Sequence, residues 1–339
     1  MAALYVTSLQ AGVGKTAVCA GLAKHLDGEG RKVGYFKPMV ADIKEKAAVD
    51  SDAVFIKKVL KLKETAADLS PVIAGGGDLT RNIKKAYDKV AKDKDVVVIE
   101  GVWRLRPGAK SAEAAYEVIK ALDAKVIVVE PYSEELATTD LSAKYRGFGE
   151  NLLGVVVNKV PARRLEMLSE QLSSRAGEAA VLGVLPEDRV LFGLTVGEIA
   201  ERIEGQILND AGKSAEVVES FMLGAMVVDS GPDYFGRRAN KAAVLRGNRP
   251  DMQLAALETS TKCLVLSGGV APTYPVLTSA KDKGIPIILA RGDTGSVVDT
   301  IEIALGKPRF NQKKKLPRLL KIMEKHFDFK AVEQGLALE

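Results

Sequence analysis

The chain has 339 residues, of which 47% are hydrophobic and 27% charged, a balance typical of a globular protein long enough for two domains. The net charge is +5, but the surplus of lysine and arginine gathers at residues 311–339 and not on an aromatic-rich basic face, so we expect no nucleic-acid partner. No apolar run reaches the length of a membrane span and no signal peptide precedes the first predicted strand, so we expect a cytoplasmic protein with no membrane partner. Cys19 and Cys263 each lie in an apolar segment, which favours small core residues over a disulfide or metal pair.

Short β-branched segments alternate with helical patterns through residues 1–205. The predicted strands are 4–7, 32–36, 95–99, 125–129, 153–157 and 181–185, and the predicted helices are 15–26, 52–62, 79–91 and 112–122. Strands that are apolar throughout are typical of a parallel sheet covered on both faces. The pattern therefore predicts an α/β fold with a doubly wound, mostly parallel sheet, whose ligands bind at the carboxyl ends of the strands.

A polar, glycine-containing stretch at residues 206–214 is interpreted as a linker. After it we predict a helix near 215–223, strands at 225–228, 242–245, 263–266 and 285–289, and helices at 250–257, 274–283 and 296–305. This second alternation indicates a smaller α/β domain. The expected organisation is a first domain at 1–205, the linker, a second domain at 215–310, and a basic C-terminal helix or tail at 311–339.

The strongest functional signal lies at the first predicted strand-to-helix junction, where residues 12–16 read Gly-Val-Gly-Lys-Thr. Successive N–H groups of such a loop and the N-terminus of the following helix bind a phosphate anion. Lys15 adds a positive charge, and Thr16 offers a hydroxyl group to Mg²⁺. The predicted nucleotide-binding residues here are Gly12, Val13, Gly14, Lys15, Thr16 and Ala17.

This loop resembles that of the dethiobiotin synthetase family, which reads Gly-Thr-Asp-Thr-Gly-Val-Gly-Lys-Thr. The last five positions match, whereas Ser8, Leu9, Gln10 and Ala11 replace the first four. The resemblance implies a P-loop NTPase fold with ATP and Mg²⁺ as cofactors.

Two further segments carry the same resemblance. Lys37 is followed by proline, as in the family, and residues 51–53 read Ser-Asp-Ala. The resemblance implies that Lys37 acts with Lys15 in stabilising charge on a transferred phosphate, and that Asp52 helps to hold the metal. The alternatives are an exposed lysine at a strand end and an aspartate that caps a helix.

Three residues end predicted strands on the ligand side of the sheet. Glu100 follows a buried apolar strand, where a carboxylate needs a partner, and Mg²⁺ is a suitable one. Asn158 follows another strand, at a position where related ATPases read the base, although a turn asparagine is the alternative. Pro186 lies in a segment that, by the resemblance, lines the base.

The residues expected near the phosphate acceptor differ from those of the dethiobiotin synthetase family. Gln10 and Ala11 stand where members that carboxylate a diamine have aspartate and threonine, so we expect no dethiobiotin synthesis. Arg104 and Arg106 lie in the segment 102–108, which also carries the only tryptophan, and they either bind an anionic ligand or are solvated.

The second domain resembles the domain named for its Asp-Arg-Thr-Gly-Gly pattern, through residues 245–251 and 264–269. Asn248 stands where an aspartate is common, and Ser-Gly-Gly at 267–269 stands for Thr-Gly-Gly. Its glycines suit either a ligand site or tight turns.

The order of the two domains resembles the N-terminal region of long-form phosphotransacetylases and stand-alone relatives. Because the acyltransferase domain would follow Glu339, we expect no acetyltransferase activity. Two functions stay open. One is an ATP- and Mg²⁺-binding regulatory or sensor protein, a homodimer with an unidentified small-molecule effector. The other is an ATP-dependent ligase that activates a carboxylate or carbamate substrate.

Overall fold

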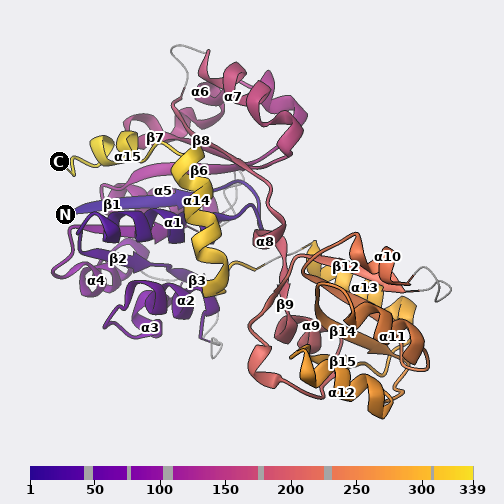
Figure 1. Cartoon of the computed structure of the whole chain (residues 1–339). Helices are drawn as coiled ribbons and strands as arrows, with labels where there is room; N and C mark the ends of the chain where they lie inside the picture. Colours follow the sequence, from indigo (N-terminus) through magenta and orange to yellow (C-terminus); the bar gives the residue numbers. More distant parts are fainter. Residues whose placement is uncertain are drawn as a thin grey trace. The chain divides into compact units, whose positions relative to one another are not determined.

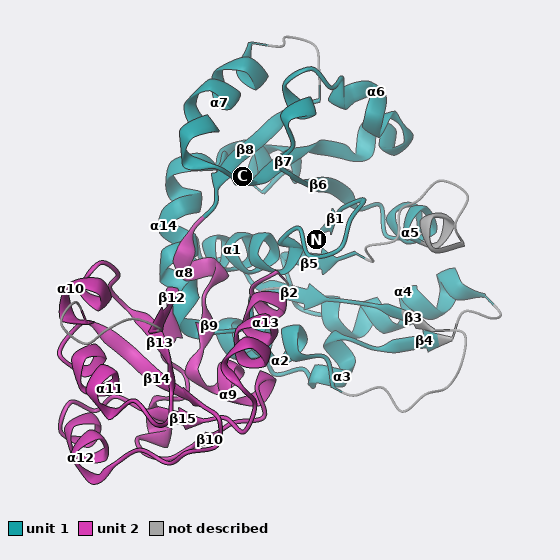
Figure 2. Ribbon diagram, turned by 90° about the vertical axis from the view of Figure 1, so that its right-hand side faces the viewer, with its two compact units in different colours: residues 1–187, 310–339 teal, residues 188–309 magenta. Residues whose placement is uncertain are grey.

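The computed structural model describes residues 1–41, 49–74, 78–101, 110–174, 179–224, 231–306 and 309–338 (Figure 1). The chain forms two compact units, one of residues 1–187 and 310–339 and the other of residues 188–309 (Figure 2). None of the helices in the described ranges combines the length and the apolar composition needed to cross a membrane.

The first unit is built on a six-stranded parallel sheet with the strand order β2-β5-β1-β6-β7-β8. Its strands are β1 (Ala2–Thr7), β2 (Val33–Phe36), β5 (Val96–Glu100), β6 (Lys125–Pro131), β7 (Leu152–Val160) and β8 (Val181–Pro186). Strands β1, β2 and β5 are buried along almost their whole length because they are apolar at successive positions. The predicted parallel α/β class is confirmed.

Helices on both faces cover this sheet. They are α1 (Lys15–Gly28), α2 (Ser51–Leu60), α3 (Ala66–Leu69), α4 (Leu79–Ala91), α5 (Lys110–Ala121), α6 (Leu141–Tyr145) and α7 (Leu165–Ser173), with a small strand pair β3 (Met39–Ala41) and β4 (Val72–Ala74). The chain moves outward from β1 to β2 and back from β2 to β5. Because such crossovers are right-handed, α1 and α4 lie on opposite faces, as a doubly wound sheet requires.

The C-terminal segment belongs to the first unit. It forms α14 (Leu316–His326) and α15 (Phe329–Gly335), and α14 packs on α1 and β8. The buried side chains of α14 are Leu319, Ile322 and Met323, which share one face of the helix. The segment expected to be a basic helix or tail therefore carries an apolar face that joins the core.

The second unit contains a five-stranded sheet in the order β10-β15-β14-β13-β12, parallel except for β10. Its strands are β10 (Gln206–Ile207), β12 (Ser220–Gly224), β13 (Lys241–Arg246), β14 (Thr261–Ser267) and β15 (Ile287–Leu289), with a separate pair β9 (Leu194–Thr195) and β11 (Val217–Val218). Its helices are α8 (Arg189–Phe192), α9 (Val196–Arg202), α10 (Gly231–Gly236), α11 (Pro250–Leu257), α12 (Tyr274–Asp282) and α13 (Thr294–Leu305). Successive side chains of β13 pack into two different hydrophobic cores, one on each face of the sheet. Ala242 and Val244 belong to one core, and Ala243 and Leu245 belong to the other.

The division between the units differs from the expected boundaries. Residues 188–205 lie in the second unit, because Leu194, Val196 and Ile199 pack into its core. The segment expected to be a linker also joins that unit. Its residues 206–207 form β10, and the buried Asn209 side chain bonds both Ile285 O (2.9 Å) and Ile287 N (2.9 Å).

The predicted helix at 215–223 was wrong. These residues form β11 and β12, and β12 pairs with β13 with Phe221 opposite Ala242. Val217, Val218, Phe221 and Met222 are spaced as on one face of a helix, but pairing of β11 with β9 and of β12 with β13 outweighs that local pattern. The strand predicted at 225–228 lies outside the described residues.

Candidate functional site

The loop between β1 and α1 has the conformation of an anion-binding turn. Gly12 and Gly14 have φ values of +70° and +98°, in the left-handed region that glycine adopts without strain. Gly14 is the N-cap of α1, and neither a capping side chain nor an acidic residue occupies the first turn. The N–H groups of that turn are therefore directed at the loop without a side-chain acceptor, which favours an anion. Val13 and Ala17 are buried, so they can serve a nucleotide only through their backbone.

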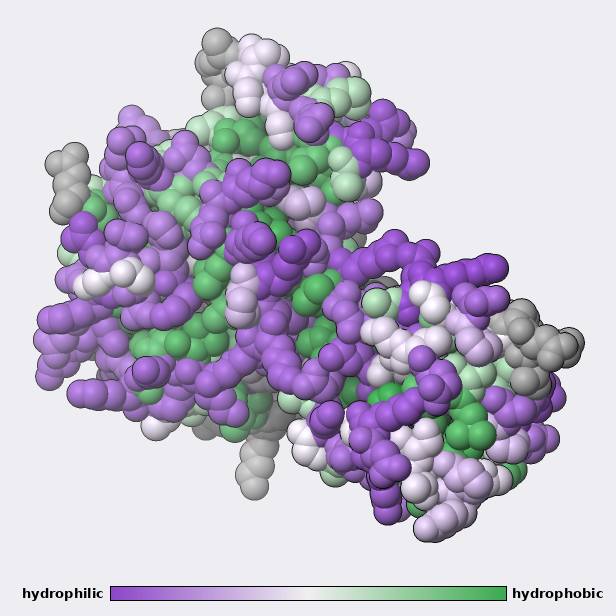
Figure 3. All heavy atoms as spheres, in the orientation of Figure 1, coloured by the Kyte–Doolittle hydropathy of each residue, from purple (hydrophilic) through white to green (hydrophobic). Residues whose placement is uncertain are grey.

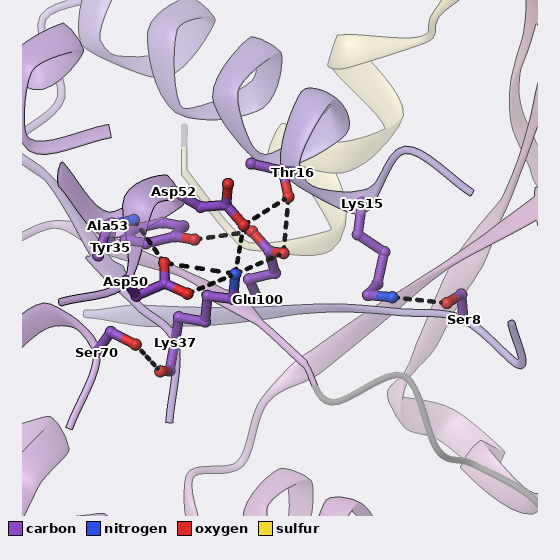
Figure 4. Close-up of polar contacts among 10 residues, drawn as sticks. All are labelled: Ser8, Lys15, Thr16, Tyr35, Lys37, Asp50, Asp52, Ala53, Ser70 and Glu100. Atoms are coloured by element: carbon purple, nitrogen blue, oxygen red, sulfur yellow. Dashed lines mark hydrogen bonds and ion pairs between the residues drawn. The ribbon is translucent and has the colours of Figure 1, made fainter. Parts of the chain in front are cut away.

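Lys15 points along the loop toward Ser8, apart from the acidic cluster formed by Asp50, Asp52 and Glu100 (Figure 4). Its ammonium group donates to Ser8 Oγ (2.9 Å), and Ser8 donates in turn to the carbonyl of Gln10 (2.6 Å). Burial lowers the pKa of Lys15, and the attraction of Glu100 offsets this only in part. A phosphate group in the loop would supply the counter-charge that stabilises this ammonium group.

Three oxygen-bearing side chains meet one residue further along α1. Thr16 Oγ1 donates to Glu100 Oε1 (2.8 Å) and lies 3.4 Å from Asp52 Oδ2. The residues come from α1, β5 and α2, which the fold brings to the carboxyl edge of the sheet. Within the described ranges, no group of three histidine, cysteine or acidic side chains is arranged to hold a metal. One hydroxyl and two carboxylates still fit Mg²⁺, which keeps several waters and shares phosphate oxygens.

Lys37 is the cation of this acidic cluster. Its ammonium group lies 2.5 Å from Asp52 Oδ2, 3.2 Å from Asp50 Oδ2 and 3.5 Å from Glu100 Oε1. Its backbone is fixed as well, because its N–H donates to Leu69 O (2.7 Å) and its carbonyl accepts from Ser70 Oγ (2.9 Å). Burial alone would lower the pKa of Lys37, but Glu100 and the two aspartates together raise it, so the group stays charged.

Glu100 is the most buried acid of the cluster, with 4% of its surface exposed. It ends β5 opposite Val6 of β1, next to the phosphate loop. Tyr35 of β2 donates to its Oε2 (2.7 Å). Burial raises the pKa of Glu100, Lys37 lowers it, and Asp52 raises it. Sequence reasoning did not find Tyr35, because nothing local in β2 shows that its hydroxyl reaches the neighbouring strand.

Asn158 and Lys159, at the end of β7, hold the phosphate loop from the other side. Asn158 Nδ2 donates to Val13 O (2.8 Å), and its Oδ1 accepts from the N–H of Lys159 (2.9 Å). Lys159 adopts φ +63° and donates from Nζ to Gly12 O (2.7 Å). The sequence did not identify Lys159, since its contact depends on the fold. Base recognition by Asn158 stays a prediction.

The structure thus brings the predicted loop residues together with Lys37, Asp52, Glu100 and Asn158. Pro186 lies at the end of β8, in register with Val160, and its predicted contact with the base stays a prediction. The segment with Arg104 and Arg106 lies outside the described residues. Asp50, which directly precedes the Ser-Asp-Ala segment and was not predicted as a site residue, has two roles. It caps α2 by accepting from Ala53 N (2.8 Å), and it pairs with Lys37.

Comparison with known proteins identifies both parts of the chain. The family described as AAA domain matches residues 2–193, and the DRTGG domain matches residues 198–304. A phosphate acetyltransferase from Nitrosomonas europaea is 25% identical over 313 residues, which is 85% of this chain and 45% of that protein. An ATP-dependent dethiobiotin synthetase BioD from Caldicellulosiruptor saccharolyticus is 29% identical over 181 residues, 47% of this chain and 74% of that protein. The resemblances seen in the sequence are confirmed.

The chain spans about half the length of the curated phosphate acetyltransferases that it matches. Among solved structures, the signal recognition particle receptor FtsY from Elizabethkingia anophelis aligns with a TM-score of 0.39 and 20% identity, over 55% of this chain and 58% of that one.

Proposed function

We propose that this chain, which belongs to the AAA-domain family, binds ATP with Mg²⁺ in its first unit and acts as a regulatory or sensor protein. One observation carries the proposal. The Thr16 hydroxyl lies within hydrogen-bonding distance of both Glu100 and Asp52, directly after a buried lysine at an uncapped helix N-terminus. A phosphate-bound Mg²⁺ needs this combination of oxygen ligands beside an anion site.

Different residues of the site would bind the phosphate groups and the metal ion. The loop N–H groups and Lys15 would hold the phosphates, while Thr16, Asp52 and Glu100 would hold Mg²⁺, which neutralises phosphate charge. Lys37 already occupies the acidic cluster, so an incoming divalent cation competes with its ammonium group for Asp52 and Glu100. A released Lys37 would be free to approach the phosphates. Asn158 and Pro186 would contact the base.

Calorimetric titration with ATP, ADP and GTP, each with and without Mg²⁺, tests nucleotide and metal binding. Thr16→Val removes the hydroxyl and keeps the shape of the side chain. We expect it to abolish most of the gain in ATP affinity that Mg²⁺ gives to the wild type. Thr300→Val is the matched control, because the Thr300 hydroxyl only donates to Ser296 O in α13 (2.8 Å). An unchanged Mg²⁺ effect in Thr16→Val contradicts the proposed metal site.

A ligase that activates a carboxylate or carbamate with ATP is the second candidate. The observation in its favour is Lys37, a second ammonium group beside the loop, since phosphoryl transfer depends on charge stabilisation. Phosphate release that requires bicarbonate or a carboxylic acid would support this candidate. We propose that diaminopelargonic acid is not a substrate, because Gln10 and Ala11 replace the family's acceptor-side residues. We also propose that the chain of residues 1–339 does not transfer acetyl groups. An assay with acetyl-CoA and phosphate checks this.

We further propose that the protein is a homodimer in which a ligand of the second unit alters ATP affinity. Large apolar side chains are exposed on that unit, among them Tyr274 (82%) and Val270 (47%). Green hydrophobic residues interrupt the mainly purple surface of this unit on the face drawn in Figure 3. Symmetric dimers are the commonest soluble oligomers. Light scattering that finds only a monomer at micromolar concentration removes the dimer. A titration of ATP with and without the second ligand measures the coupling, which must be reciprocal.

A further inference from the structure

The second unit contains a pocket of about 320 Å³ that the ATP site does not use. It lies where β13 and β14 end, beside the start of α13, and its polar side chains are Arg246, Asn248, Ser267, Asp293 and Thr294. Ligands of parallel α/β sheets bind at this edge, and the volume is at the small end of ligand pockets.

Glycines shape the wall of this pocket. Gly247 is packed so closely against the backbone of Val270 that a Cβ there would overlap the Val270 carbonyl oxygen. Gly268 has φ +83°, which a larger residue adopts only with strain, and its N–H donates to Gly292 O (2.7 Å). A Cβ at Gly268 would meet no atom within 4 Å. The main chain at Gly268 is therefore exposed toward the pocket.

Arg246 gives the pocket a positive charge that forms no ion pair among the described residues. Its side chain is exposed, and no ionic partner for it is found within the described ranges. Arg249, three residues along, differs because Asp251 holds it at 2.8 Å. An arginine at a pocket wall with its donors free suits the oxygen atoms of a phosphate group.

The pocket also carries hydroxyl groups and a carboxylate, and Ser267 is the in-register neighbour of Arg246 on β14. Ser267 is 2% exposed, and its Oγ lies 2.7 Å from Thr294 Oγ1. Asp293 Oδ1 accepts from Ser296 N (3.0 Å) and so caps α13. The helix N-terminus is therefore already satisfied and is not itself the anion site. Backbone hydrogen bonds, that of Ser296 first, lower the pKa of Asp293, so its carboxylate is an acceptor at neutral pH.

We propose that this pocket binds a hydroxylated organic phosphate, with the phosphate at Arg246 and sugar or polyol hydroxyl groups at Asp293 and Thr294. The pairing of a free cation with a carboxylate requires a ligand that carries both an anion and hydrogen-bond donors. Inorganic phosphate lacks the sugar or polyol hydroxyl groups that would reach Asp293 and Thr294 while the phosphate stays at Arg246. The inference deepens the regulatory role and rests on the proposed function only for its effect on ATP, because binding in this pocket is separable from binding in the first unit.

The test uses the full chain with Lys15→Ala. This substitution removes the phosphate-loop lysine and so weakens binding in the first unit, which leaves binding in the second unit to be observed. Ribose 5-phosphate, AMP and inorganic phosphate are titrated by calorimetry. At least one of the two organic phosphates binds, and inorganic phosphate binds at least about tenfold more weakly. Arg246→Ala weakens organic phosphate binding by about tenfold or more, the effect of losing a charge-assisted hydrogen bond. Arg202→Ala, an exposed arginine of α9, is the control and has no effect.

Asp293→Asn distinguishes the contribution of the ligand's hydroxyl groups from that of its phosphate group. Asparagine caps a helix as well as aspartate does, so the melting temperature stays close to wild type. The variant weakens binding of the organic phosphates but not of inorganic phosphate. The proposal is overturned if neither organic phosphate binds, if inorganic phosphate binds equally well, or if Arg246→Ala has no effect. It is also overturned if Arg246→Ala dissociates a dimer without changing phosphate binding, since the pocket is then a subunit contact.

Discussion

The Tyr35 hydroxyl donates a hydrogen bond of 2.7 Å to Glu100 Oε2, across the neighbouring strands β2 and β5. It holds one carboxylate oxygen, so that the other, Oε1, faces Thr16 at 2.8 Å and Lys37 at 3.5 Å. Both partners of the bond are buried. The orientation of the oxygen that would bind Mg²⁺ is therefore set from inside the core of the sheet.

Tyr35→Phe removes this donor and leaves Glu100 Oε2 buried without it. We expect the free energy of unfolding to fall by about 1–3 kcal/mol, the cost of an unsatisfied buried acceptor. The Mg²⁺-dependent part of ATP binding should fall as well, because Glu100 loses its fixed orientation. Urea unfolding and calorimetry measure the two effects. Tyr274→Phe, at an 82% exposed position, should change neither. A Tyr35→Phe variant with wild-type stability contradicts the role of the bond.

Lys15→Ala tests the phosphate side of the site. Lys15 is 8% exposed and reaches along the loop to Ser8. Its loss should weaken ATP binding by about 1.5–3 kcal/mol, as expected for a hydrogen bond to a charged group. The apo protein should not lose stability, because removing a buried ammonium group relieves its desolvation. Calorimetry and thermal unfolding check both statements. Unchanged ATP affinity would falsify the assignment of the loop.

Glu100→Gln tests the metal side and carries a pH dependence. Burial raises the folded-state pKa of Glu100, so the folded protein holds more protons than the unfolded chain between the ordinary value of 4.5 and that raised pKa. Its contribution to stability therefore falls as pH rises through this window. ATP binding should show the opposite trend, because Mg²⁺ needs the carboxylate. In Glu100→Gln the Mg²⁺ effect should be small and independent of pH in this window. Full Mg²⁺ dependence in the variant would indicate a purely structural acid.

The sequence predicted the features that depend on local patterns. Apolar strands such as residues 95–99 and the loop at 12–16 follow from short segments, and the carboxylate of Glu100 falls at the sheet edge because a parallel strand ends there. Tyr35 and Lys159 were not found because their partners are set by strand register and by the folding of the loop.

Long-range packing also explains the two main differences in the fold. Residues 217–222 have a spacing that suits a helix, but β11 pairs with β9 and β12 pairs with β13, which makes them strands. The basic character of residues 311–339 concealed the three apolar residues of α14 that pack on the first unit. In both cases the decisive partner is distant in the sequence.

Gly14→Ala tests the contact between the phosphate loop and β7. The residue has φ +98°, and a Cβ there would overlap the amide of Asn158. Gly12 is the matched control, with φ +70° and nothing within 4 Å of its Cβ position. Gly12→Ala should cost about 1–2 kcal/mol of backbone strain. Gly14→Ala should cost more, because Asn158 must also give up its bond to Val13 O (2.8 Å).

A double-mutant cycle isolates the part of the Gly14→Ala cost that comes from displacing Asn158. Asn158→Ala alone removes the bond, and the pair Gly14→Ala with Asn158→Ala removes the overlap as well. We expect the double variant of Gly14→Ala and Asn158→Ala to lose less unfolding free energy than the sum of its two single variants. For Gly12→Ala and Asn158→Ala, the loss of the double variant should equal that sum. Additivity in both cycles would mean that a Cβ at position 14 does not displace the Asn158 side chain from Val13 O.

Lys241 provides a pH-dependent stability in the second unit. It begins β13, is fully buried, and donates to Thr259 Oγ1 (2.9 Å) and Ser260 O (3.0 Å), with the Phe235 ring centroid 6.0 Å away. Burial lowers its pKa from 10.5 to about 8. Between these values the unfolded chain binds more protons than the folded one, so stability rises with pH across the window. The rise is at most about 3 kcal/mol, from 1.36 kcal/mol for each pKa unit.

Two substitutions separate charge from shape at this position. Lys241→Met has no charge to desolvate, so its unfolding free energy should lack this rise and should exceed that of wild type at neutral pH. Lys241→Arg keeps its charge throughout the window. It should also lack the rise, but it should be less stable than wild type, and increasingly so as the pH increases. Calorimetric unfolding from about pH 7 to about pH 10.5 gives the three curves over the range where lysine titrates. If Lys241→Met retains the wild-type slope, another group causes it and the buried ammonium group of Lys241 carries no such penalty.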